Sequence, residues 1–155
     1  MTIANDDKVA EPSSQTLDVA QSVDALLEAA RYADMEDLES LAALAVPLDS
    51  KDSQGRTALH MAAANGHLEV VEYLIRNNVD VNITNAEKNT PLHWACLNGH
   101  SEVVRNLILA GADVAALNSH ERTPLDEAVN MGKMDIVDVI SSASAQAELE
   151  GVNIS

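Results

Sequence analysis

The chain has 155 residues, of which 46% are hydrophobic and 2% aromatic, and it contains no phenylalanine. Its 25 acidic and 9 basic residues give a formal net charge of −16, which argues against nucleic acid or an anionic membrane as the main partner because both would repel the chain. The single cysteine, Cys96, excludes an intramolecular disulfide framework and a cysteine-based zinc module. We therefore expect one all-α domain with an aliphatic core in a reducing compartment.

The N-terminal segment, residues 1–20, is polar and lacks helical periodicity, and we expect it to be a flexible tail. It has no basic region followed by an apolar run, and no stretch of the chain reaches eighteen uninterrupted apolar residues. The sequence therefore favours a soluble protein of the cytoplasm, with the nucleus as a second compartment.

An internal repeat of 33 residues organises the rest of the chain, because threonine recurs at Thr57, Thr90 and Thr123. Each threonine is followed by Ala or Pro, a pattern typical of a helix N-cap and the first helical position. Nine residues further on, each block has a glycine that can adopt the left-handed conformation which ends a helix: Gly66, Gly99 and Gly132. Each block therefore predicts a short helix between its threonine and its glycine.

A second helix is predicted after each glycine, since apolar residues recur there at helical spacing. In the two most regular blocks these residues are Leu68, Val71, Leu74 and Ile75, and Val103, Val104, Leu107 and Ile108. One helix pair is too small to bury its own apolar face, so successive pairs must stack into a solenoid.

The blocks GRTALHMAAANGHLEVVEYLIRNNVDVN and KNTPLHWACLNGHSEVVRNLILAGADVA resemble the ankyrin-repeat family in their Thr-Pro-Leu-His, Gly-His, Glu-Val-Val and Gly-Ala-Asp-Val elements. The resemblance implies an all-α solenoid of about four helix-turn-helix units with short hairpin loops, over residues 21–147. We expect a capping repeat at 21–51, repeats at 52–84 and 85–117, a C-terminal capping repeat at 118–147, and a flexible tail at 148–155.

The resemblance assigns structural roles to several repeated residues. In ankyrin proteins the histidine of the Thr-Pro-Leu-His box hydrogen-bonds backbone and ties neighbouring repeats together, which implies this role for His60 and His93. With the helix-capping residues, the expected structural set is Thr57, His60, Gly66, Thr90, His93, Gly99, Thr123 and Gly132.

Nothing in the sequence predicts catalysis, a metal site or a cofactor. The histidines lack metal-ligand spacing, and no Gly-rich phosphate loop, paired-carboxylate box or nucleophile elbow is present. Cys96 occupies a packed position of the repeat and lacks a thiolate-stabilising neighbour in sequence. We therefore expect a protein that is not an enzyme, with no catalytic residues, no metal ligands and no cofactor.

Positions that packing does not dictate are candidates for binding. The resemblance implies a concave binding surface of hairpin tips and outward-facing inner-helix residues: Tyr32, Arg56, Met61, Asn65, Glu87, Asn89, Trp94, Leu97, Asn98, His120, Arg122, Glu127 and Met131. Trp94, the single tryptophan, would form a hot spot with Met61 and Leu97. The alternative is that Trp94 packs against the neighbouring repeat as core.

Acidic residues concentrate in the first and last repeats, as solubility alone would explain and as a basic partner would also require. The stretches LLEAARYADMEDLESL, TALHMAAANGH and LHWACLNGH are similar to those of small eukaryotic ankyrin-type chaperones of a basic small-subunit ribosomal protein. The resemblance implies a monomeric adaptor or chaperone for a basic client such as a ribosomal protein, with no direct contact to nucleic acid or membrane. The alternative is an ankyrin scaffold in signalling or transcriptional regulation without preference for basic partners.

Overall fold

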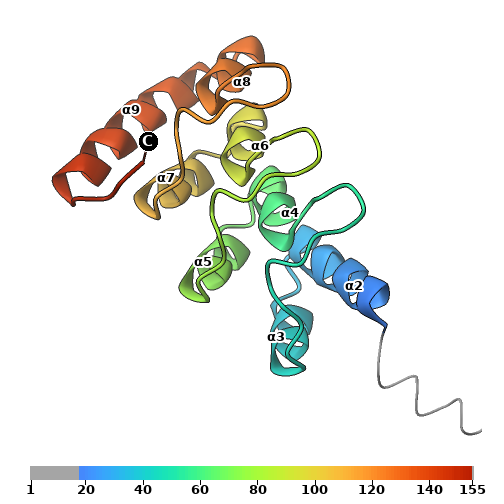
Figure 1. Cartoon of the computed structure of the whole chain (residues 1–155). Coiled ribbons are helices and arrows are strands. Elements are labelled where there is room, and N and C mark those ends of the chain that lie inside the picture. The colour runs from blue at the N-terminus through green and yellow to red at the C-terminus, as the bar shows by residue number, and fades with distance from the viewer. Residues whose placement is uncertain (1–17, 155) are drawn as a thin grey trace, which may run out of the picture.

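The computed structural model describes residues 18–154, which form eight α-helices and no β-strand (Figure 1). The helices are α2 (Val19–Arg31), α3 (Met35–Ala43), α4 (Ala58–Asn65), α5 (Leu68–Arg76), α6 (Pro91–Leu97), α7 (Ser101–Leu109), α8 (Pro124–Asn130) and α9 (Met134–Leu149). The all-α fold predicted from the 33-residue repeat is therefore correct. None of these helices is long and apolar enough to cross a bilayer.

Consecutive helices pack in pairs, and the pairs stack into a curved solenoid (Figure 1). The inner helices α2, α4, α6 and α8 form one continuous row of neighbours, while α5, α7 and α9 pack alongside one another in an outer row. The loops that precede α4, α6 and α8 project from the same side of the stack. This arrangement brings corresponding residues of successive repeats next to each other.

The inner helices begin and end where their capping residues dictate. The Thr57 hydroxyl accepts a hydrogen bond from the His60 backbone N–H at 3.3 Å, and the Thr57 N–H donates to His60 Nδ1 at 3.2 Å, which completes a capping box. The same reciprocal pair recurs at Thr90 and at Thr123. The helices end next to left-handed glycines, with φ values of 71° at Gly66, 75° at Gly99 and 72° at Gly132.

The core is aliphatic and continuous through the stack. Leu26, Leu59 and Leu92 occupy the same register position in successive inner helices, and each is at most 2% exposed. Burying one such leucine contributes about 2 kcal/mol, and alanines at neighbouring positions let the helices approach closely. Stability therefore comes from interfaces between neighbouring repeats, as expected for a solenoid.

The predicted C-terminal tail at 148–155 is wrong for residues 148–154. Helix α9 continues to Leu149, and the chain then folds back so that the Val114 N–H donates to the Ile154 carbonyl at 3.0 Å. Val152 and Ile154 pack against the core, which explains why this short segment is held in place. At the other end, Asp18 caps α2, so the domain begins before residue 21; residues 1–17 of the predicted tail lie outside the described residues.

Candidate protein-binding surface

Two buried histidines hold the central inner helices α4 and α6 to the loop of the next repeat. His60 Nε2 lies 2.8 Å from the Asn89 carbonyl oxygen, and His93 Nε2 lies 2.9 Å from the Arg122 carbonyl oxygen. Burial lowers the pKa of His60 to about 4 and also lowers the pKa of His93, because the charged imidazole would lose its hydration. Both rings are therefore neutral near pH 7, with Nε2 as the donor and Nδ1 as the acceptor of the capping box.

Two further histidines reach in the opposite direction, toward the preceding repeat. His67 Nε2 lies 2.7 Å from the Arg31 carbonyl oxygen, and His100 Nε2 lies 3.0 Å from the Ala64 carbonyl oxygen. Sequence reasoning gave these two residues no individual role. Their 33-residue spacing was the available signal, since it placed both directly after a helix-ending glycine.

Each hairpin tip is built around one side-chain oxygen that sequence reasoning missed. Asp52, Asn85 and Asn118 recur every 33 residues, and the Oδ1 of each accepts the backbone N–H groups of the residues two and four positions later. At Asp52, burial would raise the pKa, but hydrogen bonds from Arg56 and Gln54 outweigh it and hold the pKa below its usual range. The repeated Asx residue, read as a turn signal, could have identified these positions.

Neighbouring tips also bond to each other. The Ala86 N–H donates to the Gln54 carbonyl oxygen and the Ser119 N–H donates to the Glu87 carbonyl oxygen, both at 2.9 Å. The tips therefore form a tied row rather than independent loops.

Two predicted binding residues, Asn89 and Glu127, form hydrogen bonds or ion pairs within this row of tips. Asn118 Nδ2 donates to Asn89 Oδ1 at 2.9 Å and to Glu127 Oε2 at 2.7 Å. The side chain of Glu127 is only 12% exposed and lies 3.7 Å from Arg122 Nη1. The visible role of Asn89 and Glu127 is therefore to connect repeats.

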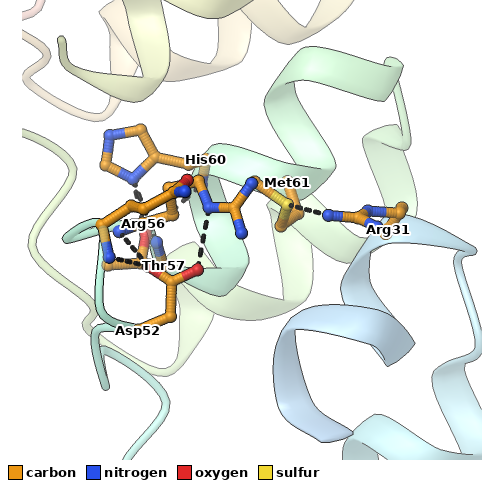
Figure 2. A network of polar contacts seen from close by, with 7 residues as sticks. Arg31, Asp52, Arg56, Thr57, His60 and Met61 are labelled. Atoms are coloured by element: carbon orange, nitrogen blue, oxygen red, sulfur yellow. Dashed lines mark hydrogen bonds and ion pairs between the residues drawn. The ribbon is translucent and has the colours of Figure 1, made fainter. Parts of the chain in front are cut away.

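The predicted exposure of Met61 is wrong, because only 4% of this residue is accessible. Figure 2 shows Arg31 reaching from α2 across to α4, where its Nη2 lies 3.4 Å from the Met61 sulfur. The same view shows Arg56 turned toward Asp52, with 2.8 Å between Nε and Oδ2. Met61 therefore belongs to the inter-repeat core, and it cannot serve as an apolar anchor for a partner.

Trp94 combines the two roles that the sequence left open. Its ring packs against the core and meets the His60 ring edge-on, with 5.2 Å between centroids and 69° between planes. It also lines an open hollow of about 360 Å³ with residues of the first two hairpin tips: Gln54, Arg56, Asn85, Ala86 and Glu87. A half-buried tryptophan held by packing, with one side facing an open hollow, is a rigid amphipathic contact surface.

Tyr32 lies in a second hollow, at the N-terminal end of the row, and is 67% exposed. This hollow has a volume of about 350 Å³, and its ionisable side chains besides Tyr32 are all acidic: Glu28, Asp34 and Asp37. The nearby cation, Arg31, extends to Met61 instead, and none of the three carboxylates forms an ion pair within residues 18–154. The hollow therefore presents uncompensated negative charge beside an aromatic ring.

The other predicted binding residues differ in exposure. Arg56 and Leu97 are half-buried, whereas a larger group is exposed to solvent: Asn65, Glu87, Asn98, His120, Arg122 and Met131. Asn65, at the end of α4, and Asn98, directly after α6, donate their side-chain amides to the carbonyl oxygens of Met61 and Trp94, one turn earlier.

The one cysteine of the chain, Cys96, is buried among the core residues of the stack. Burial raises the pKa of the Cys96 thiol to about 12, so its thiolate form is negligible near pH 7. Across residues 18–154, no group of three or more histidine, cysteine, aspartate or glutamate side chains is arranged to hold a metal ion.

Comparison with known proteins identifies the fold family. The family model for ankyrin repeats in three copies matches residues 26–118 and 78–150, which together span most of the chain. No curated protein shows a significant sequence match to this chain. Ankyrin repeats typically act as protein-interaction scaffolds rather than as enzymes. With the helix pairs, the inter-repeat histidines and the row of hairpin tips, this match shows that the chain belongs to the ankyrin-repeat family and is a protein-binding module.

Proposed function

We propose that the protein is a non-catalytic adaptor or chaperone that holds a basic client protein, such as a ribosomal protein, on its concave face. The observation that carries the proposal is the Trp94 hollow, because it offers an aromatic surface between two hairpin tips that are fixed to each other. Leu97, half-buried one turn later on the same helix, adds apolar surface. Interfaces of this kind derive most of their affinity from a few such anchors.

The preference for a basic client rests on charge. The chain carries a formal net charge of −16, and the Tyr32 hollow places three carboxylates that form no ion pair within residues 18–154 beside an exposed aromatic ring. A lysine or arginine placed there gains both charge pairing and contact with the ring face. In this proposal the apolar anchor lies at Trp94, and the N-terminal repeat orients the client by its charge.

The proposal includes a monomeric protein that works in the cytoplasm and the nucleus, where a ribosomal client is made and assembled. A fluorescent fusion that is absent from both compartments would contradict this part. Size-exclusion chromatography with light scattering tests the oligomeric state, and we expect the 16.5 kDa mass of a single chain.

Affinity capture with matched variants tests the proposed function. The immobilised full chain should retain basic proteins from a cell extract at low salt and release them at high salt, because the attraction between opposite charges is screened. Trp94→Ala should lower retention about 30-fold, as expected when a hot spot worth about 2 kcal/mol is removed. Leu44→Ala removes another apolar side chain, 68% exposed and outside both hollows, and should change retention less than twofold.

The same experiment separates the proposal from a general scaffold in signalling or transcriptional regulation. One observation favours the scaffold: Arg56 and Glu87 face the Trp94 hollow together, so this hollow has no single sign of charge. Retention of acidic or neutral proteins only, unchanged by salt but lost in Trp94→Ala, would assign the scaffold role and overturn the basic client.

A further inference from the structure

At two internal junctions of the solenoid, a nitrogen-bearing side chain of the following repeat fills the space over the glycine after an inner helix, and we call this space the seat. A Cβ built on Gly66 would lie 2.5 Å from Nδ1 of His100, and one built on Gly99 would lie 3.1 Å from Cδ of Lys133. The Nε2 of His100 approaches the carbonyl oxygen of Ala64, two residues before Gly66. The seat is therefore filled by the imidazole of His100 at Gly66 and by the aliphatic chain of Lys133 at Gly99.

The same seat is open at the C-terminal end of the row. At Gly132 a Cβ would meet no atom of the described residues within 4 Å. The carbonyl oxygen of Asn130 corresponds by register to those of Arg31, Ala64 and Leu97. Those of Arg31 and Ala64 lie within hydrogen-bond distance of a histidine ring, whereas within residues 18–154 those of Leu97 and Asn130 accept no hydrogen bond. Carbonyl groups at a helix C-terminus carry partial negative charge, which favours a cationic donor.

Aliphatic residues surround this open seat. Val129 is 47% exposed, whereas Ala63 and Cys96, its equivalents in the two preceding repeats, are fully buried. Leu125 and Val137 are half-buried, although the corresponding positions of the central repeats are at most 2% exposed. The last repeat thus keeps stacking residues that nothing in the described chain covers.

Acidic residues flank the aliphatic ones. Asp126 corresponds to His60 and His93, which contact the following repeat, and it is exposed. Asp138 corresponds to Arg105, whose Nη2 lies 3.3 Å from the Ser142 hydroxyl of the following repeat, so this position also faces the end of the stack. Both positions offer a carboxylate to whatever docks there.

We propose that the end face formed by α8 and α9 is a second docking surface, which binds an amphipathic basic helix of a partner protein. We define it by Leu125, Val129, Gly132 and Val137, with Asp126 and Asp138 at its rim. The partner helix continues the stack with its apolar side, and a lysine or arginine takes the seat over Gly132 and donates to the Asn130 carbonyl oxygen.

Two observations support a basic amphipathic helix as the occupant of this surface. The interface continues the inter-repeat contacts already present in the chain, in which His67, His100 and Lys133 occupy the equivalent position. The rim and the helix C-terminus are both negative, so they complement a cation. The inference rests on the basic partner of the proposed function but uses a surface separate from the Trp94 hollow.

A titration of the isotope-labelled full chain tests the inference by amide chemical shifts. The probe is a synthetic amphipathic helix about 18 residues long, with a leucine face and lysine elsewhere. Shifts should concentrate at Val129, Gly132 and Val137, and a peptide with glutamate in place of lysine should bind at least about tenfold more weakly. Val129→Arg should weaken the lysine peptide at least about tenfold, whereas Val19→Arg, the same change on an exposed valine of α2, should leave it within about twofold.

Several outcomes would overturn the inference. Equal binding of both peptides, or binding that Val129→Arg leaves unchanged, removes the end face as a basic-helix site. Shifts confined to Trp94 and the hairpin tips would refute the end face while leaving the proposed function standing. Self-association of the chain in sedimentation, with the same shifts in the absence of peptide, would assign the surface to a second copy.

Discussion

The box position of the repeat carries different side chains in the middle and at the end of the stack. His60 and His93 close a capping box on one side of the ring and hydrogen-bond the next repeat on the other. Asp126 closes the same capping box, with 2.9 Å between the Thr123 nitrogen and Oδ2, but is exposed to solvent. The difference teaches that one position performs two tasks, helix capping and repeat coupling, and that only the histidines perform both.

Acid titration should give the largest effect on stability, because it protonates both box histidines of the central repeats, His60 and His93. The last repeat has Asp126 instead of a histidine at this position. The pKa of His60 is about 4 in the folded chain and near 6.5 when unfolded, so the unfolded state binds more protons between these values. Stability is therefore full above about pH 6.5 and falls as the pH drops toward 4, by about 3 kcal/mol for His60 alone. His93, whose pKa is lowered too, adds to the loss.

Urea unfolding between pH 4.5 and 7 measures this dependence. His60→Gln should flatten the slope, whereas Asp126→Asn should leave it unchanged across this range, since the pKa of Asp126 is held below its usual value by the Thr123 hydrogen bonds. A slope unaffected by His60→Gln would assign the acid sensitivity to other groups.

Direct removal of the box residues should separate their two tasks. His60→Ala removes a fully buried ring, its capping bond and its bond to Asn89, and we expect a loss of about 3 kcal/mol in the free energy of unfolding. Asp126→Ala removes a capping bond at an exposed site and should cost about 1 kcal/mol. Similar losses for the two variants, measured by urea denaturation at pH 7, would contradict the division of roles.

The docked C-terminal segment should contribute least. Ile154→Ala trims a half-buried side chain, and we expect a loss of about 1 kcal/mol by the same measurement. Hydrogen exchange should show a slowly exchanging Val114 amide in the natural chain and faster exchange in the variant, because this amide donates to residue 154. A Val114 amide that exchanges at the same fast rate in both would indicate that the segment does not dock in solution.

The features that recur in every repeat could be predicted from the sequence. The 33-residue period located helix starts at Thr57, Thr90 and Thr123 and left-handed ends at their glycines, since capping is a local property of a few neighbouring residues. The stacked architecture that the period implied is present in the rows of inner and outer helices, and the family match agrees with it.

What failed depends on contacts between repeats. Met61 and Trp94 share a register position, yet Met61 is 4% exposed and contacts the Arg31 side chain of the preceding repeat. No residue near Met61 in the sequence predicts this contact with Arg31. The docking of Ile154 beside Val114 likewise joins residues 40 positions apart, outside the period that organises the chain.

The sole tryptophan provides the most direct test of binding at the concave face. The full chain labelled with 5-fluorotryptophan should give one fluorine resonance, from Trp94. The account predicts that adding the purified basic client recovered by capture at low salt shifts this resonance, and that high salt returns it to its original position. A resonance that stays in place while size-exclusion chromatography shows the complex would contradict binding at the Trp94 hollow.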